Sequence, residues 1–158
     1  MARLTPRFSA NRSVGEYTDQ YYLPAATAYR LRSADNGAIG KQIAAWQKNL
    51  QQKWAGLRFG RVKVESRDEQ HIFEVALCLK DLDPRAVRVE LCANGESGSP
   101  PARQEMTRLR PLAEEPGFYL YSATVPASRA SGDYTPRVTP YFDGASTPLE
   151  EARILWQR

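Results

Sequence analysis

The chain has 158 residues, 42% of them apolar and 25% charged, which suits one ordinary globular domain or a short lead joined to a small domain. It has no stretch of eighteen apolar residues and no apolar run of a secretory signal near its start, so we expect neither a membrane partner nor export. Two cysteines, Cys78 and Cys92, are too few for a disulfide scaffold, which favours a cytoplasmic protein with free thiols.

Positive charge is concentrated at the start of the chain. The formal net charge is +4, with a balance of +6 over residues 1–60 and −2 over residues 61–158. A basic segment of this kind suits nucleic acid, a phosphate group or an acidic partner surface, and it is equally typical of a solvated face. No arginines are interleaved with aromatic residues in a known binding phrase, so we expect no nucleic-acid partner.

The first predicted element is a helix over residues 13–32. Ser13 and Glu16 have the spacing of a capping box at its start, and Pro24 should break or kink it. The turn-forming residues 33–37 should end it. Its apolar positions recur at spacings of three and four, and they are Val14, Tyr17, Tyr21, Ala25, Ala28 and Tyr29.

A second amphipathic helix is predicted over residues 38–54. Gly56 stands where helices commonly stop, and the short turn before the helix predicts an antiparallel helical pair. Its apolar stripe consists of Ile39, Ile43, Trp46, Leu50 and Trp54. We therefore expect a helical lead over residues 1–56.

From residue 57 onward the apolar period changes to two, which indicates strands. The alternating runs are 62–64, 73–79, 87–91, 106–109, 119–125, 134–138 and 154–156. About seven short strands separated by turn signals predict an immunoglobulin-like antiparallel β-sandwich over residues 57–158, and hence an α+β protein. Tyr134 resembles the tyrosine of such sandwiches whose hydroxyl ties a late strand back to the chain.

No catalytic site can be assembled from the sequence. His71 is the only histidine, and without a nucleophile motif we expect it to be an exposed structural residue. One histidine and two cysteines fourteen residues apart do not make a zinc site, and no glycine-rich phosphate loop is present. The adjacent acids at 114–115 and 150–151 read as solvated turn residues. We assign no catalytic, cofactor-binding or metal-ligating residue to this chain.

The tryptophans are interpreted as structural. Trp46 and Trp54 share the apolar face of the second helix, and Trp156 is placed where it can cover the sandwich. Stacking of these rings on sugars is the alternative, and it requires that they be exposed.

The lead resembles a known family. Residues 8–26 are similar to a phrase of the bacterial alpha-glucan (glycogen) phosphorylases, Arg-Met-Val-x-Glu-Tyr-x-x-x-Tyr-Tyr-x-Pro, which forms a helix after the catalytic lobes. Ser13 replaces the methionine of that phrase. The matching residues are Arg12, Val14, Glu16, Tyr17, Tyr21, Tyr22 and Pro24. Tyr134, Arg137, Val138 and Pro140 fit a second phrase near the end of the long members, Tyr-x-x-Arg-Val-x-Pro.

This resemblance implies a pyridoxal-phosphate enzyme with two Rossmann-like lobes that releases glucose 1-phosphate from an α-1,4-glucan. The cofactor lysine and phosphate site of that family lie upstream of such a segment, so the chain alone is expected to be noncatalytic. Its role would be structural, or a contact to α-glucan or to another subunit. We expect Arg12, Glu16, Tyr17 and Tyr21 to dock on the catalytic lobes. The alternative is a free-standing carbohydrate-binding β-sandwich.

Overall fold

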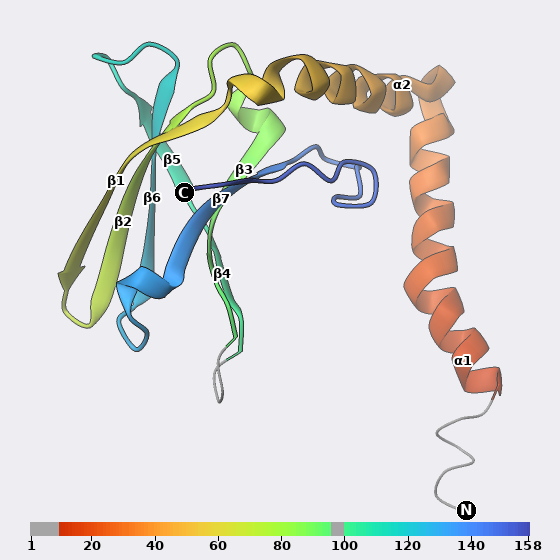
Figure 1. Ribbon diagram of the computed structural model, residues 1–158. Coiled ribbons are helices and arrows are strands. Elements are labelled where there is room, and N and C mark those ends of the chain that lie inside the picture. Colours follow the sequence, from red (N-terminus) through yellow and green to blue (C-terminus); the bar gives the residue numbers. More distant parts are fainter. Residues whose placement is uncertain (1–9, 96–99) are drawn as a thin grey trace, which may run out of the picture. The chain divides into compact units, whose positions relative to one another are not determined.

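The computed structural model describes residues 10–95 and 100–158, which form two compact units that divide between residues 44 and 45. A helical region is followed by two antiparallel sheets of four strands each (Figure 1). The predicted α+β class is therefore confirmed. Part of the loop over residues 95–101 and the first residues of the phosphorylase-like phrase lie outside the described residues.

The N-terminal helix begins earlier than its sequence pattern indicated. It consists of α1 (Ala10–Tyr17), a π-helical turn η1 (Thr18–Tyr22) and α2 (Leu23–Lys53). Ser13 lies inside α1 and not at its start, so the predicted capping box is wrong. The apolar spacing identified the helix correctly, whereas the capping signal did not mark its first residue.

Pro24 does not end the helix, so the predicted break is wrong, and a local distortion precedes the proline instead. Leu23 keeps helical dihedral angles (φ −66°, ψ −45°), and its N–H donates to the carbonyl of Thr18, five residues back. A proline ring clashes with the carbonyl four residues earlier and supplies no N–H of its own. The wider turn just before Pro24 is a known way to absorb that conflict within a helix.

The predicted turn after the first helix is confirmed. Within α2, Ala34 is extended, and Asp35, Asn36 and Gly37 have φ of +52°, +56° and +74°. Three successive left-handed residues cannot continue a right-handed helix, and Asp, Asn and Gly tolerate this conformation best. The α2 range therefore holds two helical segments, as the sequence predicted.

The second helical segment presents its apolar stripe to a core. Ile43, Trp46 and Leu50 are buried. The Trp46 indole N–H donates to the carbonyl of Ala86 at 3.2 Å, and its ring lies 5.6 Å from that of Phe142. Residues 45–53 consequently belong to the same compact unit as the sheets, and the short helix η2 (Trp54–Gly56) leads into the first strand.

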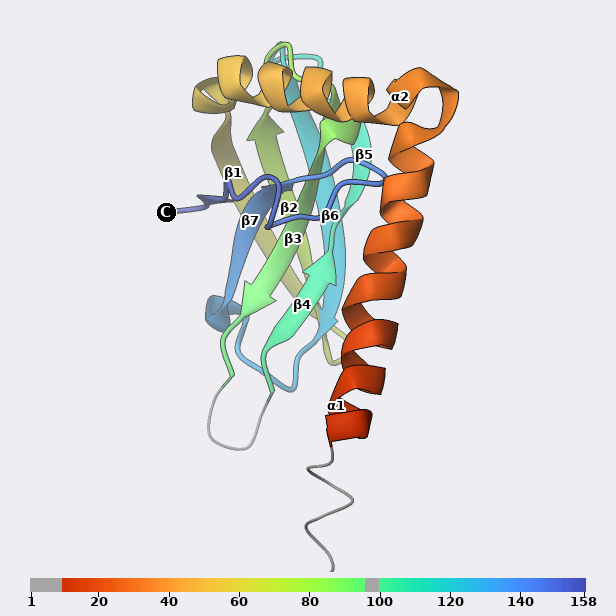
Figure 2. The same cartoon turned by 90° about the vertical axis from the view of Figure 1, so that its right-hand side faces the viewer.

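The two sheets lie face to face (Figure 2). One has the order β1-β2-β6-β5, with bounds Arg58–Arg67, Gln70–Cys78, Phe118–Pro126 and Thr107–Pro111. The other has the order β4-β3-β7-β8, with bounds Ala102–Glu105, Val87–Ala93, Tyr134–Pro140 and Leu155–Trp156. The described residues hold eight strands and not the expected seven, because the weak run near Met106 is two strands. The buried Met106 lies where the chain crosses between the sheets, and its N–H donates to Val89 at 2.8 Å.

Alternation along the strands builds the core. Phe73, Val75 and Leu77 of β2 are buried, as are Val89 and Leu91 of β3. On the opposite face of β2, Cys78 joins a small cluster with Ala76 and Phe118. Both cysteines are free, as expected.

Tyr134 begins β7, as the sequence predicted for a late strand. Its ring packs edge-on against Phe73 at 5.8 Å. No hydrogen bond joins its hydroxyl to another residue in the described part of the chain, so the expected tie back to the backbone is not seen.

Candidate functional site

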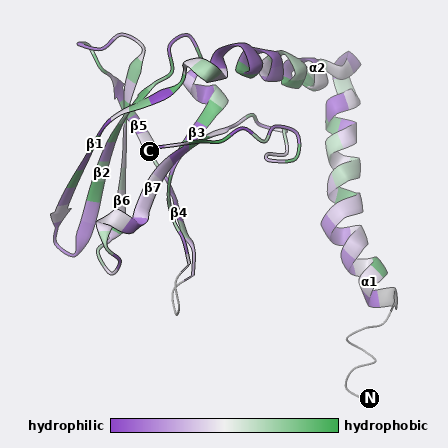
Figure 3. Ribbon diagram, in the orientation of Figure 1, coloured by the Kyte–Doolittle hydropathy of each residue, from purple (hydrophilic) through white to green (hydrophobic). Residues whose placement is uncertain are grey.

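The helix formed by α1, η1 and the first part of α2 exposes its apolar side chains. Tyr17 and Tyr21 are 59% and 60% exposed, and their rings lie 5.2 Å apart. Hydrophobic positions recur along this helix among polar ones (Figure 3). The large exposed apolar residues of the segment are Val14, Tyr17, Tyr21, Tyr22, Leu23, Tyr29 and Leu31. Such a set is far larger than the isolated apolar residues normal on a protein surface.

Arg12 and Glu16 lie on the same helix and pair with each other. Arg12 Nε is 3.0 Å from Glu16 Oε1, one helical turn away, and both side chains are about half exposed. A pair of this kind adds little stability in water. The pair lies on the same helix as Tyr17 and Tyr21.

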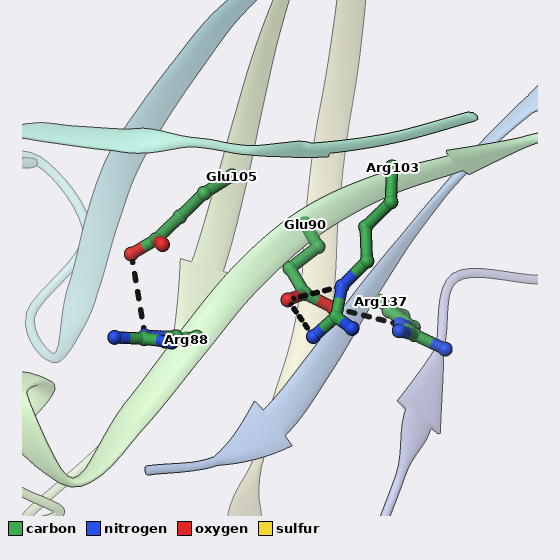
Figure 4. Close-up of polar contacts among 5 residues, drawn as sticks. All are labelled: Arg88, Glu90, Arg103, Glu105 and Arg137. Atoms are coloured by element: carbon green, nitrogen blue, oxygen red, sulfur yellow. Dashed lines mark hydrogen bonds and ion pairs between the residues drawn. The ribbon is translucent and has the colours of Figure 1, made fainter. Parts of the chain in front are cut away.

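A second concentration of polar groups lies on the outer face of the β4-β3-β7-β8 sheet (Figure 4). Glu90 of β3 is only 3% exposed and lies between two arginines from the neighbouring strands. Arg103 Nε of β4 donates to Glu90 Oε1 at 2.7 Å, and Arg137 Nε of β7 donates to Oε2 at 2.9 Å. Beside them, Arg88 and Glu105 form a longer contact of 3.6 Å.

The environment of Glu90 keeps it ionised. Burial alone opposes the charge, but hydrogen bonds from Arg103 and Arg137 outweigh it and hold the pKa of Glu90 below its usual range. The paired charges hold the arginines in place, and Arg137 lies over the ring of Trp156 with its guanidinium carbon 5.3 Å from the centroid. This cluster fixes side chains on the sheet face and contains no group poised for acid–base chemistry.

The structure revises two expectations about single residues. His71 was expected to be exposed, but it is buried. Its role is structural, because Nε2 donates to the carbonyl of Arg129 at 3.0 Å and Nδ1 contacts the Ser66 hydroxyl at 2.7 Å. Glu151, expected to be solvated, is buried and pairs with Arg153. The burial of His71 has no signal in the local sequence, because Arg129 is 58 residues away along the chain.

Sequence reasoning missed a pocket beside Trp156. The pocket measures about 330 Å³ and is lined by Cys92, Asn94, Asp133, Thr135 and Trp156. Trp156 is 42% exposed and does not close over the sandwich as expected. The alternation of β7 is the signal that could have found this site. It places Thr135 and Arg137 on one face of the sheet, and Trp156 of β8 pairs opposite Arg137 on that face.

Within residues 10–95 and 100–158, no group of three or more histidine, cysteine, aspartate or glutamate side chains could hold a metal ion. Among the same residues, no helix is both long enough and apolar enough to span a bilayer.

The fold thus defines an α+β protein that has an exposed aromatic helix and a region of two sheets. No protein-family model matches it. Over 160 aligned positions it is 28% identical to the maltodextrin phosphorylase of Thermococcus litoralis, and the alignment covers 98% of this chain and 19% of that protein. The chain is therefore similar to a part of a phosphorylase and spans about a fifth of that relative's length.

Proposed function

We propose that this chain is the noncatalytic C-terminal region of an alpha-glucan phosphorylase and acts together with the catalytic lobes of that enzyme. The similarity extends over nearly the whole chain but over only 19% of the maltodextrin phosphorylase. In this proposal, the catalytic lobes lie in the remaining part of such an enzyme. The pyridoxal phosphate and the release of glucose 1-phosphate belong, in this proposal, to the complete enzyme, which is cytoplasmic. Membership of the bacterial branch stays a prediction.

The observation that carries the proposal is the exposed aromatic surface of the N-terminal helix. The rings of Tyr17 and Tyr21 contact each other in a tilted arrangement yet remain more than half exposed, and the Arg12–Glu16 pair lies on the same helix. Tyrosines combine apolar area with a polar tip and are favoured at interfaces, and arginine forms bidentate pairs with carboxylates of a partner. We assign the docking of the catalytic lobes to Arg12, Glu16, Tyr17 and Tyr21.

The proposal divides the chain into a helical region, residues 1–56, that meets the catalytic lobes and an immunoglobulin-like sandwich, residues 57–158. Strand order supports the immunoglobulin-like assignment. In the usual lettering, β1, β2, β6 and β5 correspond to strands A, B, E and D, and β3, β7 and β8 to C, F and G. The remaining strand, β4, then lies beside strand C.

The test is to mix the chain with the separately expressed phosphorylase catalytic region of its own organism and to measure their association by analytical ultracentrifugation. We expect the double change Tyr17→Ser and Tyr21→Ser to weaken association at least tenfold, because two central aromatic anchors are lost. Tyr29→Ser, at a tyrosine that is still more exposed but lies outside the docking residues, should have a much smaller effect. Equal effects of the two changes, or no association of the unchanged chain, would overturn the docking assignment.

A second function is favoured by the pocket beside Trp156. A free-standing or attached carbohydrate-binding sandwich needs an exposed aromatic ring with polar side chains around it, and the outer face of β7 and β8 has both. This function is compatible with docking because it uses the sheets and not the N-terminal helix.

A further inference from the structure

Trp156 is held rigidly although it is exposed. Its strand β8 pairs with β7 so that Trp156 stands opposite Arg137, and the N–H of Gln157 donates to the carbonyl of Pro136 at 3.0 Å. Arg137 lies against the indole ring and is itself anchored by the buried Glu90. Arg137 and the buried Glu90 therefore fix the position of the ring on the sheet. The ring has little conformational freedom left to lose when a ligand binds.

The side chains around the ring are unengaged. Asn94, Asp133 and Thr135 line the same pocket of about 330 Å³. Within the described residues, no hydrogen bond or ion pair involves the side chain of any of the three. Their carboxylate, amide and hydroxyl groups are thus free to serve a ligand as acceptors and donors.

The charges at this pocket identify the chemical class of the ligand. Among the described residues that line it, Asp133 alone is charged. The nearby Arg137 is already paired with Glu90, and Arg129 donates to the backbone carbonyls of Asn94 and Pro100. A carboxylate without a free cation disfavours a phosphate group or a nucleic-acid backbone. An aromatic face surrounded by neutral and acidic hydrogen-bonding groups suits a neutral polyhydroxylated ring, whose C–H face packs on the indole and whose hydroxyls meet the polar rim.

We propose that the pocket of Asn94, Asp133, Thr135 and Trp156 binds a glucosyl unit of an α-glucan, with Trp156 as the stacking platform. The choice of α-glucan among neutral sugars rests on the proposed phosphorylase function. A neighbouring pocket of about 250 Å³ continues along the same sheet face, where Arg137 and Thr139 of β7 are among its lining residues. Further sugar units of a linear chain can therefore lie along β7.

The experiment is titration calorimetry of the whole chain with maltoheptaose, with cellohexaose and glucose 1-phosphate as comparison probes. We expect binding of maltoheptaose and much weaker binding of the other two. Trp156→Ala should weaken maltoheptaose binding about tenfold or more, whereas Trp156→Phe, which keeps an aromatic face, should retain most of it. Asp133→Ala should weaken binding severalfold, and Tyr29→Ala, at an exposed aromatic residue of the helix, should leave it unchanged.

Circular dichroism of each variant establishes that the fold is retained, and Asp133→Ala tests the same pocket if Trp156→Ala does not fold. Absence of maltoheptaose binding by the unchanged chain, or unchanged binding by both Trp156→Ala and Asp133→Ala, overturns the inference. Equal binding of cellohexaose overturns the α-glucan assignment, and preferred binding of glucose 1-phosphate overturns the neutral-ring argument. The docking proposal is decided separately by the association measurements on Tyr17 and Tyr21.

Discussion

Among single residues, Trp46 contributes most clearly to the core. It is 6% exposed and donates an indole hydrogen bond to Ala86 across the boundary between helix and sheet. We expect Trp46→Ala to lower the free energy of unfolding by about 3–5 kcal/mol, the usual cost of removing a large buried ring. Chemical denaturation measures this, with Trp54→Ala, at a half-buried ring, as the milder control. A loss below about 1 kcal/mol for Trp46→Ala would mean that the ring is not buried in solution.

The charge of the buried Glu90 should contribute to the stability of the fold. Glu90→Gln removes the carboxylate shared by Arg103 and Arg137 and should lower stability by about 2 kcal/mol at neutral pH, because Glu90 is buried and loses charge-assisted hydrogen bonds whereas Arg103 is 60% exposed. The matched control is Glu105→Gln in the neighbouring exposed pair with Arg88, which should cost below about 1 kcal/mol. Equal losses for the two variants would show that the Glu90 cluster adds nothing beyond a surface pair.

The effect of Glu90 depends on pH in a definite direction. Its pKa is lower in the folded chain than in the unfolded chain, so its contribution is complete above the unfolded value of about 4.3 and is lost as pH falls through the folded pKa. The difference in stability between the unchanged chain and Glu90→Gln should therefore shrink in acid. Denaturation curves at a series of pH values below neutrality measure it, and a constant difference would contradict the assignment.

Tyr121 carries a buried hydroxyl that has no hydrogen-bond partner within the described residues. An unsatisfied buried hydroxyl destabilises a fold, so Tyr121→Phe should raise stability by about 1 kcal/mol. Burial also raises the pKa of Tyr121 to about 12. The unfolded tyrosine ionises near pH 10, so the advantage of the phenylalanine variant should grow as pH rises from about 10 to 12. Thermal unfolding at neutral and alkaline pH measures both effects, and destabilisation by Tyr121→Phe would reveal a hidden partner.

At the scale of elements, the N-terminal helix and the strands should differ in local stability. A helix whose large apolar side chains are exposed opens easily, because helices in water owe most of their stability to packing. In hydrogen exchange on the isolated chain, we expect fast exchange over residues 12–24 and strong protection over residues 73–79 and 87–91. Strong protection of residues 12–24 in a monomer would contradict the need for a docking partner.

At the scale of the whole molecule, the expected absence of catalysis is open to direct test. An assay of the isolated chain with maltodextrin, phosphate and added pyridoxal phosphate should yield no glucose 1-phosphate, because the proposal places the catalytic lobes in the rest of the enzyme. Production of glucose 1-phosphate in proportion to the concentration of the chain would contradict the noncatalytic assignment. The same assay on the chain joined to its catalytic region is the positive control.

Much of the architecture could be predicted because it follows from local periodicity. Spacings of three and four marked the helices, alternation marked the strands, and the left-handed residues 35–37 marked the turn between helices. The shared helix face of Tyr17 and Tyr21 follows from the same helical period, whereas their exposure does not. The capping signal failed at Ser13, which lies inside a helix. The proline signal did not end the helix at Pro24, where a π-helical turn absorbs the proline.

The sequence by itself thus determined the order and type of the elements, the aromatic helix and the resemblance to phosphorylases. Only the tertiary structure decided which outward-facing side chains are covered: Glu90 and His71 became buried, and Trp156 was left open beside Asp133. The physical reason is that alternation tells which face of a strand a residue occupies but not what lies over that face. The cover comes from segments distant in sequence, such as Arg103 over Glu90 and Arg129 over His71, and only folding brings them together.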